Sequence, residues 1–171
     1  FGSSISEALA EAGATLISAS RSLERNQEFA EKLRHQGYEA HALQLDITST
    51  ESIAEVQARV LERFGRLDVL VNSALVTRSG GFEEQTSENW SFSAQGNMVG
   101  LFAMCKAFVP GMVAQGRGSI INISSIYGVV ANDPSLYEGT DMKQPPDYTF
   151  VKAGMINFTR YLANYYGKRG V

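Results

Sequence analysis

Hydrophobic and polar residues change along the chain in a pattern typical of helices and strands in alternation. Behind the capping-box pattern Ser4-x-x-Glu7, apolar residues recur at helical spacing until Gly13, a residue type that commonly ends helices. Short unbroken apolar runs favour buried strands instead. The pattern predicts helices over about residues 4–12, 22–36, 48–64, 87–109 and 148–166, and strands at 14–19, 38–45, 67–71 and 119–123.

Local signals refine two of these helices. Thr48-x-x-Glu51 is a second capping-box pattern and predicts the start of the third helix. Pro110 and Gly111 predict the end of the fourth. Strands that are apolar on both faces, separated by amphipathic helices, indicate an α/β fold with a parallel sheet covered on both sides. In such sheets ligands bind at the carboxyl ends of the strands, so the residues after each strand are the candidates for function.

Composition and charge argue against several classes of function. The 171 residues suit one domain, and 44% hydrophobic with 19% charged residues is an ordinary globular mixture. The net charge is −3 with no block of Lys or Arg, which argues against nucleic-acid binding. Two histidines and the single Cys105 do not make a metal site, and that cysteine suits a buried thiol in a reducing, cytoplasmic compartment. Without a run of about 18 apolar residues, we expect no membrane span.

Polar side chains follow each predicted strand. They are Ser20-Arg21, Asp46-Ile47, Asn72-Ser73-Ala74 and Ser124-Ser125, and Tyr148-x-x-x-Lys152 opens the last helix. A Tyr-x-x-x-Lys pair alone is a weak signal, because any two surface residues one helical turn apart produce it. Taken together and in this order, however, the series resembles the short-chain dehydrogenase/reductase family, of the classical type, over essentially the whole chain.

The pair also makes chemical sense. Residues i and i+4 share one face of a helix, so the Lys152 ammonium can reach toward the Tyr148 phenol. A nearby cation favours the phenolate and lowers a tyrosine pKa that is otherwise near 10. The resemblance implies that Tyr148 is the general acid/base and that Lys152 also binds the ribose of the nicotinamide. It further implies that Ser125, rather than Ser124, orients the substrate oxygen and that Asn97 holds a water in the proton path.

Two of these catalytic residues have plainer interpretations. The two serines also fit a simple strand terminus. Asn97 also fits a residue that interrupts an apolar helix in order to bond a neighbouring backbone.

The resemblance also implies a bound dinucleotide. Gly2 matches the last glycine of the family's glycine-rich turn, which lets backbone N–H groups approach pyrophosphate. Ser20 and Arg21 occupy the place of an acidic residue that would select NAD, so we expect NADP in preference to NAD. Asp46 matches the residue that bonds the adenine amino group, with Ile47 against the ring. Alternatively, Arg21 pairs with a helix carboxylate such as Glu24, and Asp46 merely starts a helix.

One cofactor motif departs from the family. Where the family reads Asn-Asn-Ala-Gly, this chain reads Asn72-Ser73-Ala74-Leu75. Asn72 and Ala74 keep their places as cofactor-binding candidates. A leucine where glycine lets the backbone approach the cofactor is expected to shift this loop.

The resemblance implies a single Rossmann-like, doubly wound domain over residues 1–171, truncated at both ends. The family's first strand, at the centre of the sheet, would precede Phe1, and a further strand and a substrate-binding loop would follow Val171. A sheet that lacked its central strand would expose two unpaired edges, so we infer that the chain is trimmed at its front. A last helix that is more apolar than one face requires predicts a homodimer or homotetramer.

The segment between Ser125 and Tyr148 is about twice as long as is usual in the family. The extra residues, about Asn132 to Pro146, are largely polar and charged and are expected to shape a site for a polar or sugar-like small molecule. The alternative is a surface insertion without a role. The segment looks like the branch linked to bacterial surface-sugar and flagellin modification.

The sequence therefore predicts an NAD(P)-dependent oxidoreductase that interconverts an alcohol and a carbonyl by hydride transfer. Two alternatives stay open. One is a nucleotide-sugar epimerase or dehydratase of the extended type, which shares the Tyr-x-x-x-Lys pair. The other is a homologue that binds a dinucleotide without catalysis.

Overall fold

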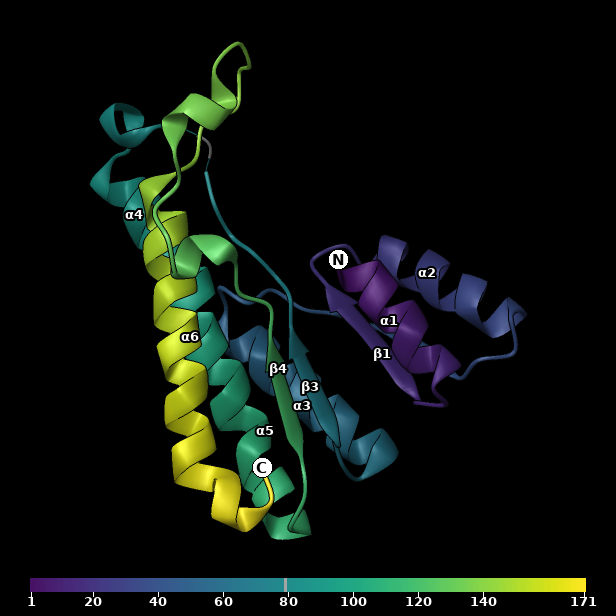
Figure 1. The fold of residues 1–171 in the computed structure, drawn as a ribbon. Coiled ribbons are helices and arrows are strands. Elements are labelled where there is room, and N and C mark those ends of the chain that lie inside the picture. The colour runs from purple at the N-terminus through teal and green to yellow at the C-terminus, as the bar shows by residue number, and fades with distance from the viewer. Residues whose placement is uncertain (79) are drawn as a thin grey trace.

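Parallel strands alternate with helices in the computed structural model, which describes residues 1–78 and 80–171 (Figure 1). The main elements are α1 (Gly2–Glu11), β1 (Leu16–Ser20), α2 (Leu23–His35), β2 (Ala40–Gln44), α3 (Thr50–Phe64), β3 (Val69–Asn72), α4 (Ser87–Ala94), α5 (Leu101–Gln115), β4 (Ser119–Asn122) and α6 (Pro146–Tyr166). A π-helical turn (Gln95–Gly100) joins α4 to α5. Short 3₁₀ turns are η1 (Phe82–Glu84), η3 (Ile126–Gly128), η4 (Pro134–Tyr137) and η5 (Gly167–Arg169). Each predicted helix and strand is present, with ends that differ by a few residues.

Neither predicted capping box starts its helix. Ser4 lies inside α1, which begins at Gly2 without a side-chain cap. At α3 the cap is Ser49 instead of Thr48, and the Ser49 Oγ accepts a hydrogen bond from the Ser52 N–H at 3.1 Å. Thr48 is engaged elsewhere, since both its N–H and its hydroxyl donate to Asp46.

The predicted end of the long helix at Pro110 and Gly111 is wrong. α5 continues through Pro110 to Gln115 and ends at Gly116, which adopts a left-handed conformation with φ 70°. A proline inside a helix costs about 3 kcal/mol, but the turn beyond it buries Met112, which is only 1% exposed. Tertiary packing therefore outweighs the local signal.

The whole helical stretch Ser87–Gln115 is long and apolar enough, by length and composition, to cross a membrane. One such helix is weak evidence for a membrane span, so it does not overturn the expectation drawn from the sequence. Core helices pass the same test, and α5 buries Met104, Phe108 and Met112 against other elements. We interpret the stretch as a core helix.

The four strands form two parallel pairs, β1 with β2 and β3 with β4. β1 and β3 are the inner strands, and both line a cavity of about 920 Å³. Among the described residues, neither β1 nor β3 pairs with another strand on the side that faces this cavity. That a further strand lies between them stays a prediction.

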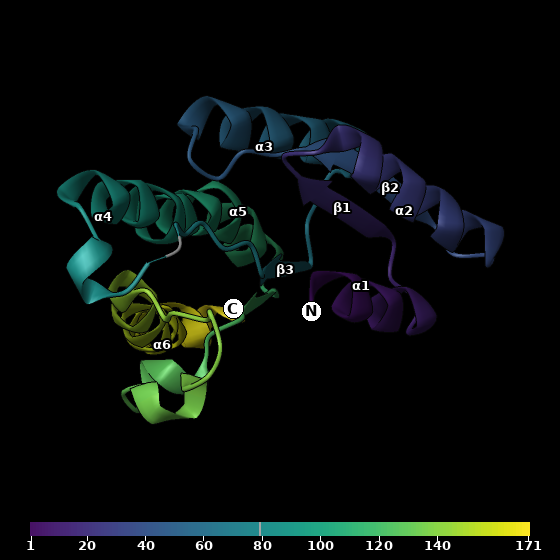
Figure 2. The ribbon, with the colours of Figure 1, turned by 90° about the horizontal axis from the view of Figure 1, so that it is seen from above.

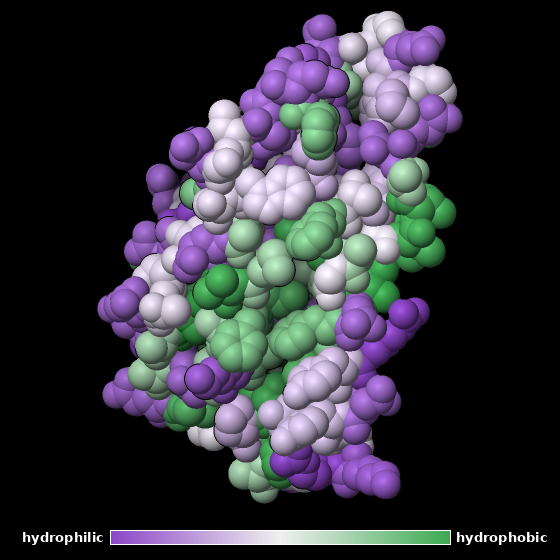
Figure 3. Space-filling view, turned by 90° about the vertical axis from the view of Figure 1, so that its left-hand side faces the viewer, coloured by the Kyte–Doolittle hydropathy of each residue, from purple (hydrophilic) through white to green (hydrophobic). Residues whose placement is uncertain are grey.

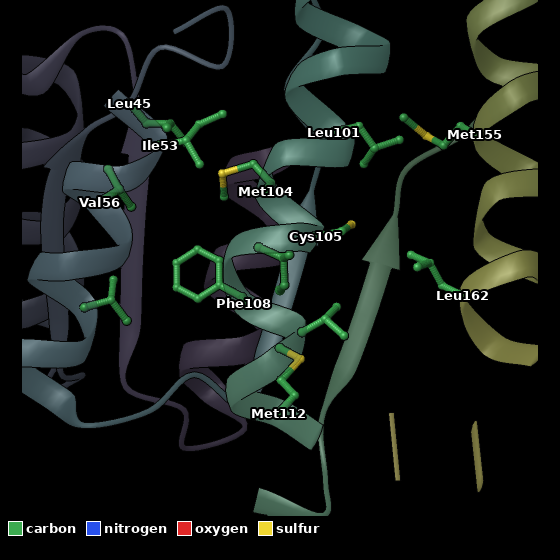
Figure 4. Packing of buried hydrophobic residues seen from close by; sticks show 13 residues of the cluster. Leu45, Ile53, Val56, Leu101, Met104, Cys105, Phe108, Met112, Met155 and Leu162 are labelled. Atoms are coloured by element: carbon green, nitrogen blue, oxygen red, sulfur yellow. The ribbon is translucent and has the colours of Figure 1, made fainter. Parts of the chain in front are cut away.

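Helices cover the strands from both sides, as Figure 2 shows from above. The main core lies where α3, α5 and α6 meet the β3–β4 pair, and a smaller cluster joins α1 and α2 to β1 and β2. In Figure 4, Met104 and Phe108 of α5 point toward Val56 of α3, and Leu101 points toward Met155 of α6. Because α5 and α6 pack against strand ends and against each other, they fix the positions of the candidate residues that they carry.

Candidate active site

Helix α6 carries the predicted pair Tyr148 and Lys152 on one face. The Lys152 Nζ lies 5.7 Å from the centre of the Tyr148 ring. Lys152 is only 4% exposed, and its Nζ donates a hydrogen bond to the Ile123 carbonyl at 2.5 Å. Burial lowers the pKa of Lys152 below its ordinary value of 10.5. The ammonium is therefore held between the end of β4 and the phenol.

The two serines after β4 have different partners. Ser124 Oγ donates to the Lys152 carbonyl at 2.9 Å and so ties the strand end to α6. Ser125 caps η3, and its Oγ accepts the Tyr127 N–H at 3.2 Å. The Ser125 hydroxyl hydrogen is left free by that bond, which makes Ser125 the better donor to a substrate oxygen.

Gly128 brings η3 close to α6. A Cβ on this residue would lie 2.7 Å from the backbone carbonyl of Lys152. Together with the bond from Ser124, this close approach places the Ser125 segment against the helical turn that carries Lys152. The catalytic candidates from β4 and α6 therefore share one packed unit.

Asn97 lies in the π-helical turn and is 5% exposed. Its Oδ1 accepts the Val76 N–H at 2.9 Å, and its Nδ2 donates to the Val76 carbonyl and to Ser93 Oγ. The side chain thus does what the plainer interpretation of Asn97 describes: it bonds the backbone of a neighbouring loop. π-helical turns are frequent at functional sites.

Five of the predicted cofactor residues line the cavity between β1 and β3. Ser20 ends β1 and Asn72 ends β3, so the carboxyl ends of both strands open on it; the five residues are Gly2, Ser20, Ile47, Asn72 and Ala74. A Cβ on Gly2 would lie 3.2 Å from Ser73 Oγ, so the start of α1 closely approaches the loop after β3. These five residues, several of which were chosen because they follow a strand, thus lie around the same cavity.

Asp46 and Arg21 lie outside the residues that line the cavity. Asp46 Oδ1 accepts the Thr48 N–H at 2.9 Å and the Thr48 hydroxyl at 2.7 Å. These bonds, helped by the charge of Arg21, lower the pKa of Asp46 below its ordinary value and keep it ionised. Arg21 is exposed, and among the described residues no ion pair joins it to Glu24.

A buried asparagine of α2 was missed by the sequence analysis. Asn26 Oδ1 accepts the Ser20 hydroxyl at 2.8 Å, and Asn26 Nδ2 donates to the carbonyls of Ser20 and Leu43. It therefore fixes the end of β1 against β2. The signal was available, because Asn26 is a polar residue within the inward helical stripe of Leu23, Phe29 and Leu33.

Asn72 also has a partner within the fold. Its Nδ2 donates to Asn122 Oδ1 at 2.9 Å, and Asn122 in turn donates to Thr159 of α6. This chain joins the ends of β3 and β4 to the last helix. It leaves the Asn72 side-chain oxygen available to other donors.

The extra segment after η3 is held at two points. The phenol oxygens of Tyr127 and Tyr137 lie 2.7 Å apart. Lys143 forms an ion pair with Glu84 of η1. The segment is thus attached beside Ser125 at one end and to the loop before α4 at the other.

Several proteins to which this chain is similar are named as enzymes. The family model described as short chain dehydrogenase matches residues 1–171. The 3-oxoacyl-[acyl-carrier-protein] reductase FabG of Vibrio cholerae is 32% identical over 170 residues, 99% of this chain and 64% of that protein. The probable galactose dehydrogenase GalD of Rhizobium meliloti is 33% identical over 170 residues, 99% of this chain and 61% of that protein.

A solved structure of a metagenomic short-chain oxidoreductase in complex with NADP superimposes with a TM-score of 0.84 at 29% identity. The superposition covers 98% of this chain and 72% of the chain of that structure. The chain thus spans somewhat less than two thirds of the length of the curated relatives that it matches.

Proposed function

Because the chain belongs to the short-chain dehydrogenase family, we propose that it is an NADP-dependent oxidoreductase that interconverts an alcohol and a carbonyl. The observation that carries this proposal is the packing of the Ser125 segment against the turn of α6 that holds Lys152, beside the Tyr148 ring. An acid/base phenol, a cation and a free hydroxyl donor are the groups that such a reaction requires.

NADP is the cofactor that the residues fit best. Ser20 and Asn72 lie at the carboxyl ends of β1 and β3, where ligands bind in such sheets. The close approach of Gly2 to Ser73 and the exposed guanidinium of Arg21 support the same cofactor. The residues that would hold it are Gly2, Ser20, Arg21, Asp46, Ile47, Asn72, Ala74, Tyr148 and Lys152. When bound, the nicotinamide supplies the hydride or accepts it. The NADP complex of the metagenomic relative supports the same choice.

Side chains of this chain would carry out the proton transfer and would orient the substrate oxygen. Tyr148 would give a proton to the substrate oxygen, or take one from it, at its phenol oxygen. The Lys152 ammonium favours the phenolate form. Ser125 would donate a hydrogen bond to the oxygen on which charge develops.

Asn97 would hold the water that completes the proton path. Both Nδ2 hydrogens of Asn97 are engaged, by the Val76 carbonyl and by Ser93 Oγ. Such a water would therefore donate a hydrogen bond to Oδ1 or to the backbone carbonyl oxygen of Asn97. Asn97 is thus a positioning residue in this proposal.

The substrate that we propose is a polar or sugar-like small molecule handled in the cytoplasm. The polar make-up of residues 132–146 supports it, and one relative is named as a probable galactose dehydrogenase. Hydroxyl groups on the substrate would be recognised by hydrogen bonds from the segment attached beside Ser125.

Replacing Tyr148 by phenylalanine tests the function. We expect Tyr148→Phe to lower kcat by about 10²-fold or more, because the variant keeps the ring but loses the proton donor. The measurement is oxidation of NADPH, followed by absorbance, with a panel of keto-sugars and ketones. The same panel run with NADH should give the slower rate.

Tyr38→Phe is the matched control, since Tyr38 packs against the small cluster around α2 and should retain activity. Turnover retained by Tyr148→Phe, or no binding of either dinucleotide to the wild type, would contradict the proposal.

A further inference from the structure

Two phenols from separate segments meet at the edge of the candidate site. Tyr127 belongs to η3, two residues after Ser125, and Tyr137 belongs to η4 within the extra segment. Their oxygens lie 2.7 Å apart, and both side chains are half-buried. The pair is therefore accessible to a small molecule but partly shielded from water.

The geometry around the pair is well defined. Asp133 caps η4 through the Ser135 N–H at 3.0 Å, and the Thr140 hydroxyl donates to the Tyr137 carbonyl at 2.8 Å. The ion pair between Lys143 and Glu84 holds the far end of the segment. Tyr137 is thus fixed on its own segment as well as by its bond to Tyr127.

The pair also lies against the helix that carries Tyr148, because η3 packs closely on α6 at Gly128. The hydrogen bond with Tyr127, together with partial burial, raises the pKa of Tyr137. Tyr137 therefore stays a neutral phenol at neutral pH and keeps its hydrogen for bonding.

Counting donors shows what the pair can recognise. Two phenols carry two hydroxyl hydrogens, and the bond between them uses one. One O–H donor and several oxygen lone pairs are left. A substrate hydroxyl can satisfy both kinds of group, whereas an apolar substrate would leave them unpaired at a cost in affinity.

We propose that Tyr127 and Tyr137 together bind a hydroxyl group of the substrate and make the enzyme selective for polyhydroxylated carbonyl compounds over apolar ones. This inference rests on the proposed function and names the residues that would set its specificity. Acyl chains, the substrates named for the FabG relatives, would not satisfy the pair.

Two four-carbon ketones provide the test. Erythrulose and butanone share a carbon skeleton, but erythrulose carries three hydroxyl groups. With NADPH in the assay, the wild type should have a higher kcat/KM for erythrulose. Tyr127→Phe and Tyr137→Phe should each lower the ratio of the two kcat/KM values by about tenfold, mainly through KM for erythrulose.

Tyr38→Phe should leave the ratio unchanged. A wild type that prefers butanone, or an unchanged ratio in both Phe variants, would overturn the inference while the proposed function stands. If NADPH is oxidised with neither ketone, the inference fails, and the dinucleotide-binding and Tyr148→Phe measurements decide the proposed function separately.

Discussion

Lys152 is a buried ammonium whose only hydrogen-bond acceptor among the described residues is the Ile123 carbonyl. Of these residues, none places a carboxylate within ion-pair distance of its Nζ. Burial of a charge without a counter-charge destabilises the folded chain. The lowered pKa of Lys152 expresses that cost. In the mechanism proposed above, the cation beside Tyr148 serves proton transfer, which would explain why the fold keeps a destabilising group there.

This cost depends on pH in a defined direction. An unfolded lysine keeps its proton up to about 10.5, and the folded pKa lies lower. Between the two values the unfolded chain binds more protons, so raising the pH stabilises the folded state. We expect the free energy of unfolding of the wild type, relative to Lys152→Met, to rise as the pH increases toward 10.5.

Urea denaturation of both proteins between pH 7 and 10.5 measures this difference, and contributions shared by the two proteins cancel in it. Lys168→Met, on the exposed turn η5, is the control variant. A difference between wild type and Lys152→Met that stays constant with pH would show that burial does not disfavour the charge.

At the residue scale, the sequence predicted what is local. The closeness of Tyr148 and Lys152 could be predicted, because a spacing of four residues places both on one helical face wherever the helix lies. The bond from Asn97 to Val76 spans 21 positions and depends on the path of the loop after β3. The bond from Asn26 to Leu43 depends equally on the packing of α2 against β2. The pattern of hydrophobic and polar residues along the chain predicts neither of these two hydrogen bonds.

The contact between η3 and α6 decides where Ser125 lies, and Gly128 makes it possible. A Cβ at this position would be 2.7 Å from the Lys152 carbonyl and 2.9 Å from Ile156. Gly128→Ala should therefore push η3 away from α6, which we expect to cost about 1–3 kcal/mol of stability. Because Ser125 moves with η3, kcat/KM should fall as well.

Gly154→Ala on α6 is the matched control, because a Cβ there meets no atom within 4 Å. We expect it to be neutral or to stabilise the helix by up to about 1 kcal/mol. Urea denaturation measures the change in stability, and oxidation of NADPH measures the change in kcat/KM. Equal stability and activity in the two variants would mean that the close approach does not position Ser125.

Elements were predicted where periodicity is strong and tertiary packing agrees with it. The strands and the helices with an apolar stripe were found in order, because burial imposes their pattern. The end of α5 was misplaced, because Met112 packs into the core beyond Pro110. The turns η3 and η4 were not predicted, since segments of three or four residues show no period.

At the scale of the whole molecule, the α/β order and its parallel strand pairs followed from the sequence. The distribution of hydrophobic side chains on the surface did not follow from the sequence, because an apolar residue on a helix can face either the core or the solvent. Helix α5 with its π-helical turn and helix α6 leave large hydrophobic side chains exposed, and Figure 3 shows a hydrophobic patch on the side where these helices lie. The exposed residues are Met98, Val99, Phe102, Phe150, Tyr161 and Tyr165.

A patch of this kind on a globular chain marks an interaction surface. We propose that a second copy of the chain covers it, in a homodimer or homotetramer. Phe102 on α5 is 52% exposed and Tyr161 on α6 is 58% exposed. Within α6, Tyr161 stacks between Phe158 and Tyr165, so a row of rings runs along the exposed helix. Aromatic side chains are enriched at such interfaces.

Light scattering after size exclusion tests this assembly. The wild type should have two or four times the mass of its single chain. Phe102→Glu or Tyr161→Glu should shift it to the single-chain mass, because a buried interface would have to desolvate an unpaired carboxylate. Leu61→Glu on α3 introduces the same charge at a side chain of similar exposure outside the patch and should leave the mass unchanged. A wild type that already has the mass of a single chain would contradict the assembly, and the apolar side chains of α5 and α6 would then lack a partner copy to cover them.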